Sequence, residues 1–151
     1  MGKGLGKKRG TPVAGRAVRG LAWAVVPLAL LSYGLYLALG LSSPPVDGPA
    51  GFTPDDAVWV LGQVLFAMVG SVVASRRPRS PIGWLFCTAG LLGLIEGIAA
   101  RAAVHALAAG QWSPAGGAAA WLSAALWYPN IALLVLGGLL FPSGRPPTRG
   151  W

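Results

Sequence analysis

Apolar residues gather into four long runs along this chain, and short segments rich in charge, Pro or Gly separate them. The runs cover 21–41, 57–75, 82–104 and 118–141. A helix needs about 20 apolar residues to cross the hydrocarbon core of a bilayer, which is about 30 Å thick. Only helices and closed barrels satisfy their own backbone polar groups in lipid. The pattern therefore predicts an all-α integral membrane protein, a four-helix transmembrane bundle over 21–141.

The first run has a second interpretation, because a basic stretch followed by an apolar stretch also begins a secretory signal peptide. The run 21–41 is longer than the apolar core of such a peptide, which has about 7–15 residues, and no Ala-x-Ala cleavage site follows it. We therefore interpret it as an uncleaved membrane helix, which Pro27 is expected to kink.

Basic residues alternate with the apolar runs in a way that predicts the orientation of the chain. All Lys and Arg residues except one lie in three segments, 1–20, 76–79 and 145–149. The remaining loops, 42–56 and 106–117, contain neither residue type. Cytoplasmic loops of membrane proteins carry an excess of Lys and Arg, so the three basic segments are predicted to be cytoplasmic.

Both termini then lie on the cytoplasmic side of the plasma (inner) membrane in a multi-pass, N-in/C-in topology. We predict a disordered basic tail over 1–20 and a cytoplasmic Pro/Arg tail over 142–151. Anionic lipid headgroups attract such basic segments by roughly 1 kcal/mol per Lys or Arg. The residues expected to bind headgroups are Arg76, Arg77, Arg79, Arg145 and Arg149.

Composition agrees with a membrane protein and argues against other classes. The chain is 54% hydrophobic and only 11% charged, whereas a soluble domain carries about 25% charged residues. Its net charge of +8 comes from segments that flank apolar runs, which favours lipid over nucleic acid as the partner. The lone Cys87 rules out an intrachain disulfide and a cysteine-based metal cluster. No catalytic motif is present, so we expect neither enzyme activity, nor a cofactor, nor a bound metal.

Polar residues inside the apolar runs carry the functional information of a membrane protein. Glu96 is the only acid inside a span, and Gln63, Tyr36 and Tyr128 each lie in a different run. A rise of 1.5 Å per residue places all four about 8–13 Å from the outer edge of the core. We predict that they form one intramembrane polar layer. Glu96 is either a structural hydrogen-bonding group or a site that responds to protons or ligands.

Small residues predict where the third helix packs. Ala89, Gly93 and Gly97 form a row at four-residue spacing, which lets helix backbones approach closely. Besides membrane lipids, the expected partners are a second copy of the chain or another membrane protein. Arg101 continues this row near the outer edge, where its side chain can reach lipid headgroups. In the fourth run, Pro129-Asn130 marks either a hinge or a static kink.

Two segments resemble a known family. The sequence RRPRSPIGWL at 76–85 resembles the R-R-P-x-N-P-I-G-W-L turn of many actinobacterial membrane proteins. The sequence LLFPSGRPPTRGW at 139–151 resembles their L-L-F-P-D-G-R-x-P-S-x-R-W. Both occur in the multi-span input region of sensor histidine kinases of two-component systems. The chain departs from the pattern at Ser80, where Asn is usual, and at Ser143, where Asp is usual.

The resemblance implies that the chain is the membrane input module of such a kinase without its catalytic part. In the family, a further membrane segment, a helical hairpin with a phosphoacceptor histidine and an ATP-binding domain would follow. His105 is predicted to be external and does not match that histidine. The alternative is a small free-standing membrane protein that acts as a partner or accessory subunit of another membrane complex.

Overall fold

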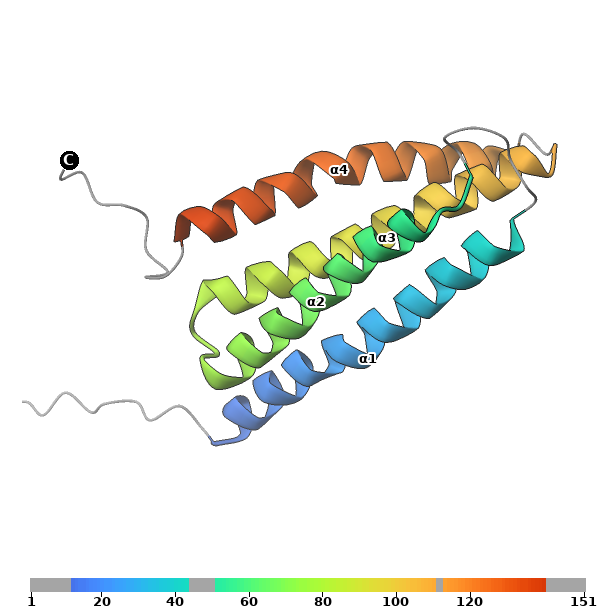
Figure 1. Cartoon of the computed structure of the whole chain (residues 1–151). Coiled ribbons are helices and arrows are strands. Elements are labelled where there is room, and N and C mark those ends of the chain that lie inside the picture. The colour runs from blue at the N-terminus through green and yellow to red at the C-terminus, as the bar shows by residue number, and fades with distance from the viewer. Residues whose placement is uncertain (1–11, 44–50, 111–112, 141–151) are drawn as a thin grey trace, which may run out of the picture.

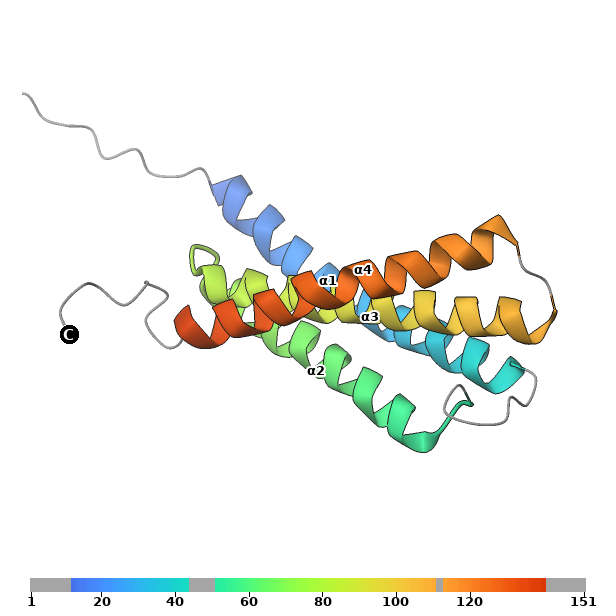
Figure 2. The ribbon, with the colours of Figure 1, turned by 90° about the horizontal axis from the view of Figure 1, so that it is seen from above.

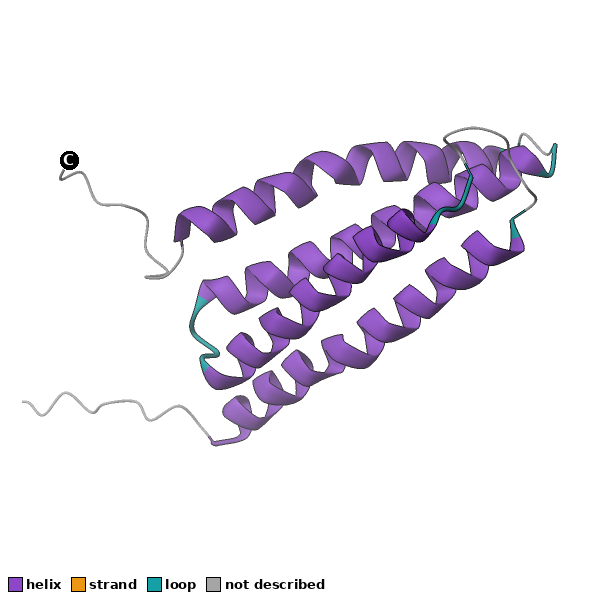
Figure 3. Cartoon of the chain, viewed as in Figure 1, coloured by secondary structure: helices purple, strands orange, loops and turns teal. Residues whose placement is uncertain are grey.

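The computed structural model describes residues 12–43, 51–110 and 113–140, and the regular elements in these ranges are all α-helices, as Figure 1 and Figure 3 show. They are α1 (Pro12–Ser42), α2 (Pro54–Arg76), α3 (Pro81–Ala108) and α4 (Pro114–Leu140). Each contains a stretch that is long and apolar enough to cross a membrane. For the described residues, the prediction of an all-α fold with four candidate membrane spans is confirmed.

All four helices begin before the apolar run that predicts them, and α1 does so by the widest margin. It starts at Pro12, so the part of the predicted disordered tail over 12–20 is helical instead. Proline is favourable in the first turn of a helix, and a helix that has formed extends with little further cost. The rest of that tail, and the predicted tail over 142–151, lie outside the described residues.

The start of α2 is fixed by a capping box. The Asp56 carboxylate accepts a hydrogen bond from the Thr53 backbone nitrogen at 2.9 Å, and the Asp56 backbone nitrogen donates to the Thr53 hydroxyl at 3.4 Å. Pro54 occupies the first turn, where its missing N–H costs nothing. These contacts satisfy backbone donors that a helix start leaves without partners.

The helices α2 and α3 cross closely because glycines lie at their contact. A Cβ atom on Gly83 would lie 2.5 Å from the Ala74 backbone nitrogen, and one on Gly90 would lie 2.5 Å from the Gln63 carbonyl oxygen. Gly70 meets the backbone of α3 in the same way. Small residues allow this approach in lipid, where van der Waals packing holds helices together. The α2–α3 pair is therefore the closely packed centre of the bundle.

The other two helices join this pair differently. α1 packs on both α2 and α3, whereas α4 packs on α3 and approaches neither α1 nor α2 within the described residues. Seen from above, α4 lies over α3 (Figure 2). The core lies among α1, α2 and α3, and its buried members include Val25, Ala29, Val60, Val64 and Leu94. On α4 only Asn130 and Gly137 are buried. Within the described residues, α4 is thus attached to the bundle through α3 alone.

The antiparallel arrangement gathers the described Lys and Arg residues, except Arg101, at one end. The start of α1, the turn between α2 and α3, and the end of α4 lie together at the left of Figure 1. In the turn, the Ser80 backbone nitrogen donates to the Arg77 carbonyl oxygen at 2.9 Å, and the Trp84 indole nitrogen donates to the Pro78 carbonyl oxygen at 3.1 Å. The sequence RRPRSP thus forms a hydrogen-bonded turn.

Candidate functional site

The structure assembles only part of the predicted polar layer. Gln63 and Tyr36 are buried and Glu96 is partly buried, but Tyr128 is 76% exposed on the outer side of α4. The helix period explains this correction. Asn130 is the buried polar residue of α4, and residues two positions apart point to nearly opposite sides of a helix. Asn130 therefore takes the inward place that the sequence analysis gave to Tyr128.

The remaining polar residues divide into two groups, and the first surrounds Arg101 on α3. Its guanidinium lies 2.9 Å from the Asp56 carboxylate at the start of α2. The guanidinium carbon lies 5.2 Å from the centre of the Phe52 ring and 5.9 Å from that of Tyr36, within the range of cation–π attraction. The Phe52 and Tyr36 rings meet edge to face at 6.0 Å. We call these four residues the Arg101 cluster.

The Arg101 cluster ties three helices together near one end of the bundle. Tyr36 comes from α1, Asp56 from α2 and Arg101 from α3. One helical turn before Tyr36, the Tyr33 hydroxyl of α1 donates to the Ala57 carbonyl oxygen of α2 at 3.2 Å. Arg101 is only 9% exposed, so its side chain is sequestered in the bundle and the expected contact with headgroups is wrong. A desolvated guanidinium gains more from a carboxylate and aromatic faces than an exposed one.

The second group lines a groove between α2 and α4. Both helices pack on α3 but do not approach each other, which leaves a groove of about 490 Å³. Its walls are mostly apolar and aromatic. They include Val58, Trp59, Phe66, Trp127, Ile131 and Leu134. We call this space the α2–α4 groove.

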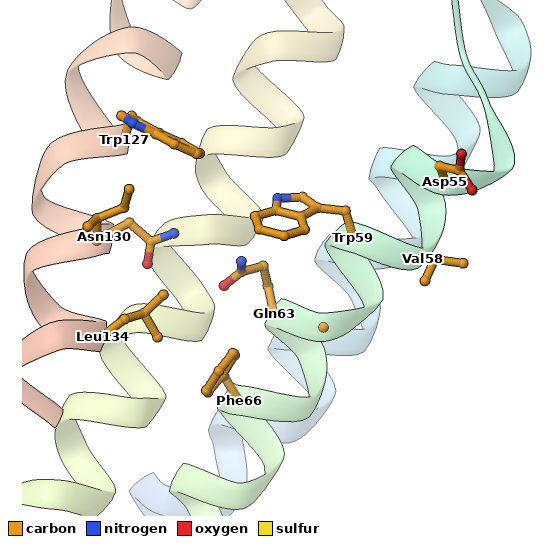
Figure 4. Close-up of a pocket in the computed structure, with 10 residues that line it drawn as sticks. Asp55, Val58, Trp59, Gln63, Phe66, Trp127, Asn130 and Leu134 are labelled. Atoms are coloured by element: carbon orange, nitrogen blue, oxygen red, sulfur yellow. The ribbon is translucent and has the colours of Figure 1, made fainter. Parts of the chain in front are cut away.

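Two amide side chains enter the α2–α4 groove from opposite walls. Figure 4 shows Gln63 on α2 and Asn130 on α4 extending toward one another. They are 6% and 4% exposed, yet among the described residues neither Gln63 Oε1 nor Asn130 Oδ1 has a hydrogen-bond partner. The Asn130 amide lies close to the Glu96 carboxyl group of α3. Buried polar atoms are almost always hydrogen-bonded in folded proteins, so two opposed exceptions mark a candidate binding site.

The predicted packing row positions one of these amides. A Cβ atom on Gly93 would overlap the Gln63 amide, so this side chain lies directly over the glycine. Gly97 faces both Val60 of α2 and Tyr36 of α1, at 3.3 and 3.4 Å from the position of its missing Cβ. Ala89 is fully buried. The small residues of α3 thus provide the space in which Gln63 lies flat against the helix before reaching the groove.

The predicted headgroup-binding residues lie apart from the groove. Arg76, Arg77 and Arg79 are exposed in or beside the turn between α2 and α3. Arg145 and Arg149 lie outside the described residues. Within the part of the chain that the structure describes, no three His, Cys, Asp or Glu side chains come together in a way that could hold a metal ion.

Sequence reasoning missed Asn130 as a site residue and Trp59 and Trp127 as walls of the groove. One signal for Asn130 was present, because an amide in the middle of an apolar run needs a partner inside the bundle. The two tryptophans gave no comparable signal, since an indole in a membrane helix is equally at home facing lipid or headgroups.

Comparisons with protein-family models, with curated proteins and with solved structures give no match to this chain. The geometry of the two polar groups is therefore the basis on which a function is proposed.

Proposed function

We propose that this chain is a multi-pass membrane input module that receives a signal in the α2–α4 groove and transmits it through a movement of α4. The observation that supports this most directly is the pair of opposed amides, Gln63 and Asn130, whose oxygens have no partner in the described part of the chain. An input module needs a site that a signal can occupy and an element that the signal can shift. The groove supplies the first and α4 the second.

The unpartnered amides give a physical reason for two positions of α4. Leaving a buried acceptor without a partner costs about 1–3 kcal/mol. If α4 approaches α2, the amide of Gln63 can donate to Asn130 Oδ1 and remove part of this cost. A ligand that donates to the oxygens instead stabilises the open position seen here. A signal shifts such an equilibrium only through its different affinity for the two positions.

The place of α4 in the chain also supports this role. α4 ends at Leu140, within the segment 139–151 that resembles the input region of actinobacterial sensor histidine kinases. A movement of α4 relative to α2 would therefore displace the segment that leads toward the cytoplasm in the proposed topology. In such a kinase, that displacement would be the output of the input module.

The proposal includes an N-in/C-in orientation in the plasma membrane, with Arg76, Arg77 and Arg79 bound to anionic headgroups. The support is the grouping of these residues with Arg16 and Arg19 at the same end of the bundle. Reporter fusions test it. A reporter inserted in the turn between α2 and α3 is expected to be active only as a cytoplasmic reporter. Activity of an external reporter at that turn would contradict this orientation.

Distance measurements between spin labels test the movement of α4 without knowledge of the signal. Labels at Val69→Cys on α2 and Val135→Cys on α4 occupy exposed positions outside the groove. A control pair uses Val69→Cys with Ile95→Cys on α3, across the closely packed centre. The native Cys87 is buried and does not compete for the label.

In lipid nanodiscs, the α2–α4 pair is expected to show two populated distances while the α2–α3 pair shows one. The replacement of Gln63 and Asn130 together by Leu removes the amide pair and is expected to leave one α2–α4 distance. An α2–α4 distribution as narrow as that of the control pair, unchanged by the double replacement, would overturn the proposed movement.

A second candidate function is that of a partner or accessory subunit, and a feature of α1 favours it. Gly34 lies in the middle of α1 with open space where its Cβ would be, next to the exposed Leu31 and Leu35. A small residue on an outer face allows another helix to approach closely. If α1 packs against a second copy, Gly34→Leu will abolish dimers counted by single-molecule photobleaching in bilayers. A monomeric native chain would remove this argument.

A further inference from the structure

We propose that the α2–α4 groove binds a neutral lipid whose polar head carries two hydroxyl groups, as in a monoacylglycerol. One hydroxyl donates to Gln63 Oε1 and the other to Asn130 Oδ1. This inference names the class of signal for the proposed input module. The role of the lipid as a signal rests on the proposed function. Binding itself depends on the groove alone.

The two amide oxygens determine what the head of the ligand must offer. Both are acceptors, both belong to side chains that are more than nine-tenths buried, and these side chains extend toward one another from opposite walls of the groove (Figure 4). Neither oxygen has a hydrogen-bond partner in the described part of the chain, so each of them still requires a donor. An oxygen acceptor needs an N–H or O–H donor. A head with carbonyl or ether oxygens alone leaves both acceptors unsatisfied.

The charges near the groove exclude an anionic head and disfavour a cationic one. The lining contains no Lys or Arg, while Asp55 lies at its edge and Glu96 contacts Asn130. A phosphate or carboxylate would find no cation among the lining residues. Gln63 lies about 13 Å along α2 from Pro54, well inside the apolar part of the helix, where a charged ammonium is costly. Hydroxyl groups provide donors without charge.

The walls of the groove determine what the rest of the ligand must be. Trp59 and Phe66 of α2 and Trp127 and Ile131 of α4 form an apolar passage beside the amides. The groove volume of about 490 Å³ falls within the range of about 300–1,000 Å³ that small-molecule sites occupy. Trp59 and Trp127 are themselves largely exposed on the outside of the bundle, so the groove opens toward lipid. An acyl chain can leave the groove along this passage into the bilayer.

A transmembrane helix of another protein fits the groove less well. The backbone groups of such a helix are already paired within it. It would reach the two oxygens only with two polar side chains at the correct spacing. A lipid diol carries two donors on adjacent carbons and needs no such coincidence.

Quenching of tryptophan fluorescence tests the proposal with the full chain in lipid nanodiscs. The probe is a monoacylglycerol with a brominated acyl chain, which quenches tryptophan on contact. The matched probe has both hydroxyls converted to methyl ethers and keeps the same chain. A variant with Trp59→Phe and Trp127→Phe identifies the part of the quenching that arises in the groove.

We expect saturable quenching by the diol that requires Trp59 and Trp127, and no saturable quenching by the methyl ether. Gln63→Leu is expected to weaken diol binding about tenfold, the effect of about one hydrogen bond. Thr88→Val is the control, since the Thr88 hydroxyl is exposed and bonds only to the Trp84 carbonyl oxygen of its own helix. It is expected to leave binding unchanged.

Equal affinity for the diol and its methyl ether, or full affinity in Gln63→Leu, would overturn the proposal. Tighter binding of a brominated phosphatidic acid than of the diol would also overturn it. The same holds if the chain forms dimers in which no probe quenches Trp59 and Trp127. The outcomes distinguish an error in the ligand class from an error in the proposed function. If the diol does not bind but α4 shows two positions, only the ligand class is wrong. If the diol binds and α4 shows one position, the signalling role is wrong.

Discussion

The two places where polar side chains enter this bundle differ in how far their interactions are satisfied. In the Arg101 cluster, the guanidinium has a carboxylate at 2.9 Å and two aromatic faces, and the carboxylate is itself bound to Thr53. In the α2–α4 groove, two amide oxygens are as deeply buried and have no partner in the described residues. An ion pair thus forms a complete polar cluster in one place, whereas two neutral amides form an incomplete one in the other.

The neighbouring helices explain the difference. The Arg101 cluster lies where α1, α2 and α3 all pack on one another, so each polar group can find a partner from another helix. The α2–α4 groove lies where two helices share only α3 as a neighbour. A satisfied polar cluster stabilises one arrangement of helices. An unsatisfied one leaves free energy that a ligand, or a change in helix position, can recover.

Loss of Arg101 should cause the largest loss of stability. Arg101→Met removes one partner of a buried pair and leaves the Asp56 carboxylate without its cation. We expect the free energy of unfolding to fall by about 3 kcal/mol, the lower end of the range for buried pairs because Asp56 is partly exposed. Reversible unfolding by SDS in mixed micelles measures this. A change below about 0.5 kcal/mol, typical of surface sites, would show that the cluster does not brace the bundle.

Filling the contact between α2 and α3 should have the next largest effect. Gly90→Val places a side chain against the backbone of α2 at Gln63 and Ala67. Overpacking of a close contact costs about 1–3 kcal/mol, and we expect about 2 kcal/mol because backbone atoms cannot give way. Gly138→Val on α4 is the control, since open space surrounds that position. If both variants unfold at the same SDS concentration, α2–α3 is not the closely packed centre.

Replacement of the two groove amides, Asn130 and Gln63, should reduce stability by different amounts. Asn130→Leu removes the amide that lies close to the partly buried Glu96 carboxyl group, so we expect a loss of about 1–2 kcal/mol. The double variant Asn130→Leu with Glu96→Leu removes both partners and is expected to recover most of this loss. The same SDS titration measures both. A double variant as unstable as the single one would show that the contact with Glu96 is not the cause.

Replacement of Gln63 should have the smallest effect on stability. In Gln63→Leu the lost amide makes no hydrogen bond in the described structure, and an apolar side chain of similar size fills its place over Gly93. We expect stability within about 0.5 kcal/mol of the native chain, or slightly above it, because an unpartnered buried polar group is replaced. A loss comparable to that of Arg101→Met would place Gln63 in a satisfied network and remove the contrast between the two regions.

The sequence predicted the elements of the fold and only part of the site. Apolar runs of about 20 residues leave a membrane helix as the main possibility, so the four helices followed from pattern alone. The depths of Gln63 and Glu96 in the membrane, calculated from the constant rise per residue, stay a prediction. The rotation of each helix about its own axis could not be predicted. The sequence of α4, for example, is apolar on nearly all sides, so its pattern does not select one face. Tyr128 was therefore placed inside, and Asn130 was assigned only to a hinge or a kink.

Pairing between distant residues was equally hidden. Arg101 and Asp56 lie near the same end of neighbouring antiparallel helices, and their opposite charges were visible in the sequence. Whether Arg101 turns outward to headgroups or inward to Asp56 depends on how α1 supplies Tyr36 and on where Phe52 lies before α2. The orientation of this side chain depends on packing among three helices, and the periodicity of a single helix does not predict it.

The distance between α2 and α4 tests the central claim most directly. Spin labels at Val69→Cys and Val135→Cys report it in nanodiscs, with and without saturating monoacylglycerol. The account predicts two populated distances without the lipid and a shift to the longer one when it is added, and it predicts that chains that also carry Gln63→Leu need about tenfold more lipid for the same shift. One distance that neither the lipid nor the Gln63→Leu replacement changes would contradict it.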